Sequence, residues 1–281
     1  MFILPYTKVD EKMATNPAST PRHIQVQSSV QLSPHMQRIY FSGSGFSGFP
    51  RDAGGAHIKL FFPDQPDATP PLPYKNELGK VVWPDGKKPI TRTYTIRDFL
   101  VQEQLLVIDF VRHADFGIAA DWAVKAQPGN IIGLAGPGGP ARFNPAADYF
   151  IFIGDLSALP MIAASLEQLT DTAFGEVWIE TENETDQQNL SHPEGIQIHW
   201  ISSDSDTEST IQHAFKSLDW SHNNISVTLA GENTRVVNLR KILRQQYSIS
   251  KTNLYAVPYW KRGHSEESYH DERHNVMDDE G

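Results

Sequence analysis

The 281-residue sequence contains no cysteine. This absence excludes disulfides, a cysteine nucleophile, thiolate zinc sites and iron–sulfur clusters held by thiolates. No run of about 18 apolar residues occurs, so we expect no membrane span. The apolar stretch at the start of the chain is too short for a signal peptide, and the residues that follow it are too polar. Together these absences lead us to expect a cytoplasmic protein.

Basic residues are scarce relative to acidic ones, with 24 Lys and Arg against 34 Asp and Glu and a net charge of −10. The last 18 residues, 264–281, hold seven acids and one Arg and so carry −6 of that total. No basic tail or patch points to nucleic acid. An anionic ligand must therefore be bound by a local cluster of basic residues rather than attracted by the whole chain.

The first half of the chain has the pattern of a β-barrel. Residues 1–20 form a polar arm without periodicity, and residues 63–90 form a long, proline-rich connection. A short helix is predicted at 119–126. Alternating apolar residues and turn signals predict strands at 23–32, 36–42, 56–62, 91–97, 104–113 and 130–135. Strands at this spacing predict an N-terminal antiparallel β-barrel over residues 21–145.

The second half has the pattern of a parallel sheet. Residues 148–154 form a continuous apolar run, typical of a strand that is buried on both faces. Further strands at 176–180, 196–201, 225–230 and 253–257 alternate with helices at 158–170, 207–218 and 232–246. This alternation predicts a C-terminal doubly wound α/β domain over residues 146–263. Residues 264–281 are predicted to form an acidic helix or tail.

The stretch Arg92–Arg97 carries residues that suit a ligand. On a strand, residues two apart share a face, so Arg92 and Tyr94 point the same way. The Arg can bind phosphate oxygens, and the Tyr can lie against a ring system. Thr95 can offer its amide and hydroxyl to a polar ring edge. The alternative is an edge strand with one exposed Arg in an ion pair, and six residues alone would favour it.

Six segments in order resemble the siderophore-interacting proteins, which are FAD-dependent ferric-siderophore reductases with the architecture of ferredoxin reductases. They are residues 32–39, 56–60, 92–97, 154–160, 230–232 and 259–263. The resemblance implies Arg92 on the FAD phosphates, Tyr94 against the flavin and Thr95 near its reactive edge. The predicted flavin-binding set also contains Arg97, His113, Ala119, Ala120 and Trp260.

Residues 113–122 are the second predicted flavin segment, a loop that feeds a helix N-terminus. Its free amides and positive dipole end suit a pyrophosphate. Family members usually have Gly-Pro-Ala-Ser where this chain has Gly117-Ile118-Ala119-Ala120. This difference keeps the backbone amide donors and removes the serine hydroxyl. We therefore expect FAD to contact the amides of Ala119 and Ala120. His113 taken alone is better explained as a structural hydrogen-bonding residue.

Gly154–Ser157 ends a buried strand and opens a helix, which is where parallel sheets bind nucleotides. No Gly-x-Gly-x-x-Gly occurs, and the family commonly has Glu and Thr where this chain has Leu156 and Ser157. The predicted NAD(P)H-binding residues are Asp155, Ser157, Ala158, Glu180 and Glu232. Glu180 could bond a ribose hydroxyl or simply face water, and the two explanations are equal. NADH and NADPH therefore both stay open.

Lys261 and Arg262 follow the last strand, and the resemblance implies basic residues there. With Lys59, and with Lys75 or Lys80 from the long connection, they could form a pocket for a ferric siderophore, because a ferric tris-catecholate is strongly anionic. Each loop lysine singly is better explained as an ordinary surface residue. His264, His270 and His274 include an i, i+4 pair, but an acidic surface helix explains them more simply than a metal site.

The sequence therefore predicts a flavoenzyme that passes electrons from NAD(P)H, or another donor such as ferredoxin, through FAD to a ferric siderophore. Hard oxygen donors prefer Fe(III), so reduction would release Fe(II). We expect a monomer that binds neither nucleic acid nor a membrane. Two alternatives stay open. One is a flavin or electron-transfer reductase for another partner, and the other is a non-catalytic flavin- or siderophore-binding protein.

Overall fold

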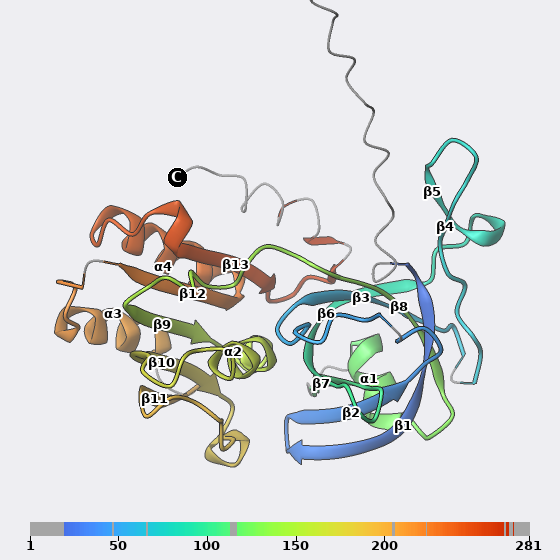
Figure 1. The fold of residues 1–281 in the computed structure, drawn as a ribbon, viewed down its shortest axis with the longest axis horizontal. Coiled ribbons are helices and arrows are strands. Elements are labelled where there is room, and N and C mark those ends of the chain that lie inside the picture. The colour runs from blue at the N-terminus through green and yellow to red at the C-terminus, as the bar shows by residue number, and fades with distance from the viewer. Residues whose placement is uncertain are drawn as a thin grey trace, which may run out of the picture.

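The computed structural model describes residues 20–46, 48–65, 67–112, 117–203, 206–222, 224–266, 268–269 and 272. A closed β-barrel and a five-stranded parallel sheet with helices lie side by side, the barrel on the right of Figure 1 and the sheet on the left. The predicted order, a barrel followed by a doubly wound sheet, is confirmed. Within the described residues, no helix is both long enough and apolar enough to cross a membrane.

The barrel is antiparallel, with the strand order β1-β2-β7-β6-β3-β8. Its strands are β1 (Arg22–Ser33), β2 (Met36–Ser42), β3 (His57–Phe62), β6 (Ile90–Leu100), β7 (Leu105–Val111) and β8 (Ile131–Gly138). Alternate residues fill the interior, among them Ile39, Ile58 and Leu60, which are fully buried. Helix α1 (Ile118–Lys125) adds Trp122 to the same core, stacked on Phe41. Closure of the barrel gives each of its strands a neighbour on both sides, although the pairing of β6 with β7 covers only part of β6.

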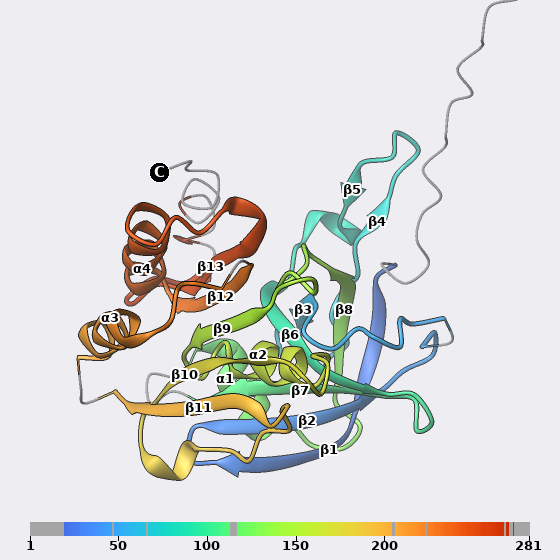
Figure 2. The same cartoon turned by 60° about the vertical axis from the view of Figure 1, so that its left-hand side comes forward.

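The proline-rich connection between β3 and β6 contains a hairpin that the sequence analysis did not predict. Strands β4 (Tyr74–Lys75) and β5 (Val81–Val82) precede the 3-10 helix η2 (Pro84–Gly86), and the hairpin stands away from the barrel in both ribbon views (Figures 1 and 2). Asn76 makes the turn, because its Oδ1 accepts the amides of Leu78 and Lys80, each at 3.0 Å. Side-chain bonds of this kind are local turn chemistry that strand periodicity does not reveal.

The parallel sheet has the order β11-β10-β9-β12-β13, with β9 in the middle. Its strands are β9 (Tyr149–Gly154), β10 (Phe174–Thr181), β11 (Gly195–Ser202), β12 (Ile225–Glu232) and β13 (Leu254–Trp260). Helices α3 (Thr207–Ser217) and α4 (Asn233–Gln245) pack on one face, and α2 (Leu159–Leu166) packs on the other. The 3-10 helices η3 (Glu184–Asp186) and η4 (Lys251–Asn253) lie in connections. The chain reverses its winding direction between β9 and β12, which creates a crevice at the carboxyl ends of these strands.

Helix α2 lies between the sheet and barrel strand β6, and all eight of its residues are buried. The sequence predicted a longer helix, over residues 158–170. A helix packed on both sides is apolar all round. Polar contacts flank it, because Arg97 pairs with Glu167 at its end, and Gln168 donates a 2.9 Å bond to the Gly54 carbonyl. A second polar junction joins the two halves where Ser33 donates to Asp186 at 2.6 Å.

Candidate functional site

Strand β6 leaves part of one edge unpaired within the described residues. It pairs with β3 from Ile90 to Thr95, but its register with β7 begins only at Ile96. The amide of Ile96 donates toward the β3 side, to the Ala56 carbonyl at 2.9 Å. Because amide direction alternates along a strand, the amide of Thr93 points to the opposite edge. The strand that the sequence singled out therefore presents main-chain donors that no described strand pairs.

Arg92 and Tyr94 lie on one face of β6, as their spacing requires, and pair with the buried residues Leu60 and Ile58 of β3. The Tyr94 ring lies 4.5 Å from the Phe110 ring, between centroids. Burial, assisted by a nearby carboxylate, raises the pKa of the Tyr94 hydroxyl well above its usual 10, so the phenol stays neutral. This face offers a cation beside a neutral aromatic plate.

Helix α1 begins without a side-chain cap. Its N-cap is Gly117, and the first intrahelical bond runs from the amide of Asp121 to the Gly117 carbonyl. The amides of Ala119 and Ala120 therefore have no partner within the helix. Trp122 places α1 in the same hydrophobic cluster as Tyr94. A guanidinium, helix amides without an intrahelical partner and an aromatic ring are the groups that a flavin with a pyrophosphate needs, so these residues fit FAD. The predicted flavin residue His113 lies outside the described residues.

Thr95 points to the other face of β6, toward the parallel sheet, and is 6% exposed. Its side chain hydrogen-bonds Tyr259 of β13, whose hydroxyl lies 3.4 Å from the hydroxyl of Tyr255. Burial raises the pKa of Tyr259 well above 10. Tyr259 lies in the segment 259–263 that resembles the family, but its contact with Thr95 could not be predicted, because no spacing rule joins residues so far apart in the chain.

The carboxylate of Asp155 joins three strand ends at the crevice of the parallel sheet. Its Oδ1 accepts the Ser157 amide at 2.9 Å and the Ser157 hydroxyl at 2.5 Å. Its Oδ2 accepts the Glu232 amide at 3.0 Å and the Trp260 indole at 2.8 Å. Trp260, predicted to lie near the flavin, is thus tied to a residue predicted to bind NAD(P)H.

The other predicted NAD(P)H residues lie at the same edge of the sheet. Ala158 is fully buried and opens α2. Glu232 caps α4, accepting the Thr234 amide at 2.7 Å. Glu180 forms an ion pair with Arg235. Burial raises the pKa of the Glu180 carboxyl, and the guanidinium of Arg235 opposes that rise. The five residues predicted from sequence are therefore neighbours, and their contact with a nucleotide stays a prediction.

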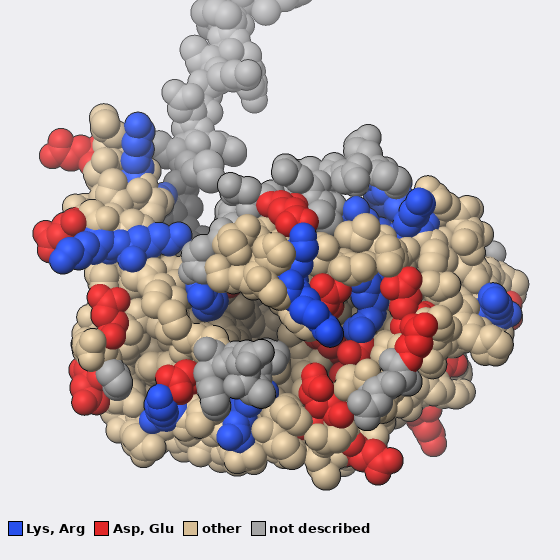
Figure 3. Space-filling model, turned by 180° about the vertical axis from the view of Figure 1, so that it is seen from behind, with Lys and Arg blue, Asp and Glu red and all other residues tan. Residues whose placement is uncertain are grey.

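The predicted siderophore-binding residues come from both halves of the molecule. Lys59 on β3 donates to Thr93 Oγ1 at 2.5 Å and to Glu266 at 3.1 Å. Lys261 donates to Glu272 at 2.5 Å, and Arg262 is exposed. Figure 3 shows a hollow near the centre of the face opposite Figure 1, bordered by basic and acidic side chains. Lys75 and Lys80 lie instead on the projecting hairpin.

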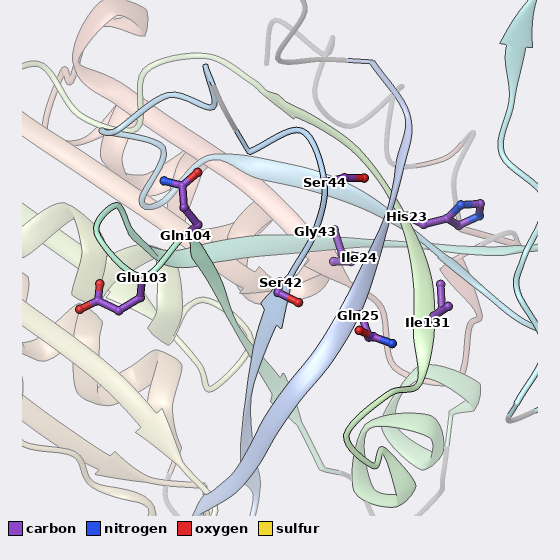
Figure 4. A pocket seen from close by; sticks show the side chains of 9 residues that line it. All are labelled: His23, Ile24, Gln25, Ser42, Gly43, Ser44, Glu103, Gln104 and Ile131. Carbon is purple, nitrogen blue, oxygen red and sulfur yellow. The ribbon is translucent and has the colours of Figure 1, made fainter.

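A pocket of about 430 Å³ opens between β1, β2 and the β6–β7 turn, away from every predicted site residue. The side chains that line it point in different directions rather than toward one point (Figure 4). It therefore carries no chemistry of its own. Among the residues that the structure describes, no group of three or more His, Asp or Glu side chains could hold a metal ion. His270 and His274 lie outside that part of the chain.

Comparison with known proteins gives two family matches along the chain. Residues 25–141 match the siderophore-interacting FAD-binding domain, and residues 147–263 match the siderophore-interacting protein family. The ferric vibriobactin reductase ViuB of Vibrio cholerae is 41% identical over 263 residues, covering 92% of this chain and 96% of that protein. The NADPH-dependent ferric-chelate reductase of Escherichia coli is 32% identical, covering 85% and 92%.

Solved structures include relatives over most of the chain. The siderophore-interacting protein SipS from Aeromonas hydrophila has a TM-score of 0.79 and 33% identity, covering 94% of this chain and 100% of that one. The ferredoxin-NADP+ reductase from Plasmodium falciparum has a TM-score of 0.59 at 16% identity, covering 85% and 96%, and this likeness concerns the fold alone.

Proposed function

Because this chain belongs to the siderophore-interacting protein family, and is a flavin-dependent oxidoreductase of that family, we propose that it reduces ferric siderophores. One observation carries the proposal. Strand β6 places Arg92 and Tyr94 on one face, in the hydrophobic cluster that also holds the uncapped helix α1. That donor set fits FAD. The absence of cysteine leaves the flavin as the redox centre.

The residues of the chain bind and orient the cofactor. Arg92 and the amides of Ala119 and Ala120 would neutralise the phosphates, and the neutral ring of Tyr94 would cover one side of the flavin. FAD, when bound, supplies the exchange between a two-electron donor and a one-electron acceptor. Reduction of the iron then weakens its complex, because hard oxygen donors bind Fe(III) more strongly than Fe(II).

We propose NAD(P)H as the electron donor, bound at the crevice where β9 and β12 end. Asp155 holds this edge together, and Ser157, Ala158, Glu180 and Glu232 surround it. Parallel sheets bind nucleotides at such a reversal of winding. The relative from Escherichia coli is named as NADPH-dependent. Ferredoxin is the alternative donor, and Lys59, Lys261 and Arg262 are the proposed contacts of the siderophore.

The test uses the FAD-loaded protein without oxygen. Titration with NADH and with NADPH should bleach the flavin absorbance. Stopped-flow mixing of the reduced protein with a ferric siderophore should then restore it faster than mixing with a simple iron chelate. Equal rates would favour a reductase of another partner. Absorbance that neither nicotinamide nor reduced ferredoxin bleaches would contradict an enzymatic role. We also propose a cytoplasmic monomer, which fractionation and size-exclusion chromatography would check.

A further inference from the structure

The carboxylate of Glu266, which follows the last strand of the sheet, contacts two strands of the barrel. Its Oε2 accepts the Thr93 amide at 2.9 Å. Its Oε1 accepts the Thr93 hydroxyl at 2.5 Å and the Lys59 ammonium at 3.1 Å. The Thr93 amide lies on the edge of β6 that no described strand pairs. A main-chain amide, a hydroxyl and a cation thus converge on one anionic group.

This position is partly enclosed and favours negative charge. The Glu266 side chain is 18% exposed. Burial alone would raise the pKa of the Glu266 carboxyl, but Lys59 and the two donors of Thr93 outweigh burial and hold the pKa below its usual value. The carboxyl is therefore ionised at neutral pH. Hydrogen bonds to an ionised acceptor are about twice as strong as neutral ones, so the three donors form an effective anion site.

The same C-terminal segment also forms an ion pair with Lys261, the second lysine that was predicted to bind the siderophore. Glu272 pairs with Lys261 at 2.5 Å. Between the two acids, Tyr269 is 2% exposed and donates a 2.7 Å bond to Asn233 of α4. Lys261 also lies 6.0 Å from the centroid of the Tyr269 ring. One buried tyrosine thus anchors a segment whose acids neutralise a lysine on each half of the molecule.

We propose that Glu266 occupies the place of a negatively charged oxygen of the substrate, and that an anionic ferric chelate binds by displacing it. The inference rests on the proposed function and adds a competitor that belongs to the chain itself. The Thr93 amide is fixed by its strand, so this donor stays in place when the carboxylate leaves. The released carboxylate is solvated by water, so no unpaired charge is left buried.

A tethered competitor lowers the affinity for a free ligand, because its effective concentration is on the order of millimolar. The binding test uses the oxidised, FAD-loaded protein and two probes, iron(III) tris-catecholate, which is anionic, and a neutral ferric trihydroxamate. Quenching of tryptophan fluorescence gives the dissociation constants. We expect Glu266→Gln to lower the constant for the tris-catecholate about tenfold, since the tether no longer supplies a competing charge, and to leave the neutral probe unchanged.

Two further variants complete the design. Glu194→Gln removes one exposed carboxylate outside the cluster and controls for net charge. A chain that ends at Gly263 removes Glu266 and Glu272 together and should bind the tris-catecholate more tightly still. An unchanged or raised dissociation constant in Glu266→Gln would overturn the inference. An equal gain in affinity in the Glu194→Gln control would also overturn it. So would a Glu266→Gln variant in which only the dissociation constant for NADP+ changes, because the phosphates of NADP+ are the other source of anionic oxygens.

The binding assay is independent of electron transfer. If the wild-type protein binds the tris-catecholate but its reduced flavin does not reduce the iron, the reductase proposal fails. Tighter binding of the tris-catecholate by Glu266→Gln would still support the Glu266 inference. If electron transfer is fast but Glu266→Gln changes no affinity, the Glu266 inference fails alone. Absence of any binding by the wild-type protein and by Glu266→Gln would overturn both.

Discussion

The indole Nε1 of Trp260 donates a 2.8 Å hydrogen bond to Oδ2 of Asp155, so the end of β13 is fixed to the end of β9. The Glu232 amide at the end of β12 donates to the same oxygen, and Ser157 donates twice to the other. Four donors from three strand ends meet one carboxylate that is 7% exposed. The edge proposed for NAD(P)H is therefore built around a single acceptor.

Replacing Asp155 with Asn should destabilise this edge. The new amide group would direct a donor either at Trp260 and Glu232 or at Ser157, so at least one buried donor would lose its acceptor. We expect a loss of about 2–4 kcal/mol in the free energy of unfolding, measured with urea. Ser157→Ala removes one hydroxyl bond and should cost about 1 kcal/mol. An Asp155→Asn protein within about 0.5 kcal/mol of the wild type would contradict the role of this carboxylate.

A substitution at Gly231 tests the same hydrogen-bond cluster around Asp155, this time through the backbone. Its φ is +138°, and a Cβ placed there would lie 2.5 Å from Oδ2 of Asp155. Gly231→Ala should therefore cost about 2–4 kcal/mol through strain and the clash together. Gly129 is the matched control, because its φ is +98° but a Cβ would meet nothing within 4 Å. Equal losses in the two variants would show that the contact with Asp155 adds nothing.

Asp186 should make the junction between the two halves sensitive to acid. Burial acts to raise the pKa of Asp186, but hydrogen bonds from Ser33 and His35 outweigh it and hold the pKa below 3.8. A carboxyl with a lower pKa in the folded state stabilises the protein above its unfolded pKa. That stabilisation is lost as the pH falls through the folded-state value.

Asp186→Asn removes this linkage and leaves buried donors without a charged acceptor. At neutral pH the variant should lose about 2–4 kcal/mol of unfolding free energy, measured with urea. The difference from the wild type should shrink as the pH falls below 3.8. Asp171→Asn, at an exposed position, should show no such trend. A difference that is constant with pH would mean that Asp186 is not ionised in the folded protein.

Arg92→Ala should lose FAD while the fold survives. The guanidinium would make charge-assisted bonds to phosphate, so we expect affinity to fall at least tenfold, which corresponds to about 1.4 kcal/mol. The ratio of flavin to protein absorbance after dialysis measures the loss, and circular dichroism checks the fold. Arg92→Lys keeps the charge and should retain part of the affinity. A variant that stays fully yellow would refute the assignment of β6.

Arg97 was predicted to bind the flavin, and the structure shows it in a two-bond ion pair with Glu167, at 2.5 and 2.9 Å. Because Glu167 is 35% exposed, each of Arg97→Ala and Glu167→Gln should cost only about 0.5–1 kcal/mol in urea unfolding. The double variant should cost less than the sum of the two. FAD affinity separates the roles, because only Arg97→Ala should weaken it if Arg97 also contacts the flavin. Equal affinity in both variants would leave Arg97 a junction residue.

Local sequence patterns were sufficient to predict the architecture. The two-residue period over 23–32 and 91–97 predicted barrel strands, and the unbroken apolar run at 148–154 predicted a strand buried on both faces. The structure confirms these strands. The same period placed Arg92 beside Tyr94. These features are predictable because they depend on neighbours in the chain. The hairpin at Asn76 and the early end of α2 at Leu166 were not predicted. Hydrogen bonds from a side chain form the hairpin turn, and packing on both sides of the helix determines where α2 ends.

The sequence by itself determined the order of the two halves, the family and the strand that we propose for FAD, because periodicity and ordered segments can be recognised without knowledge of contacts. Only the tertiary structure decided the partners of the charged residues. Asp155 binds Trp260, Arg97 binds Glu167 and Lys59 binds Glu266, each pair coming from distant parts of the chain. Nothing in the spacing of a charged residue names its partner, because an ion pair forms only after folding brings two surfaces together.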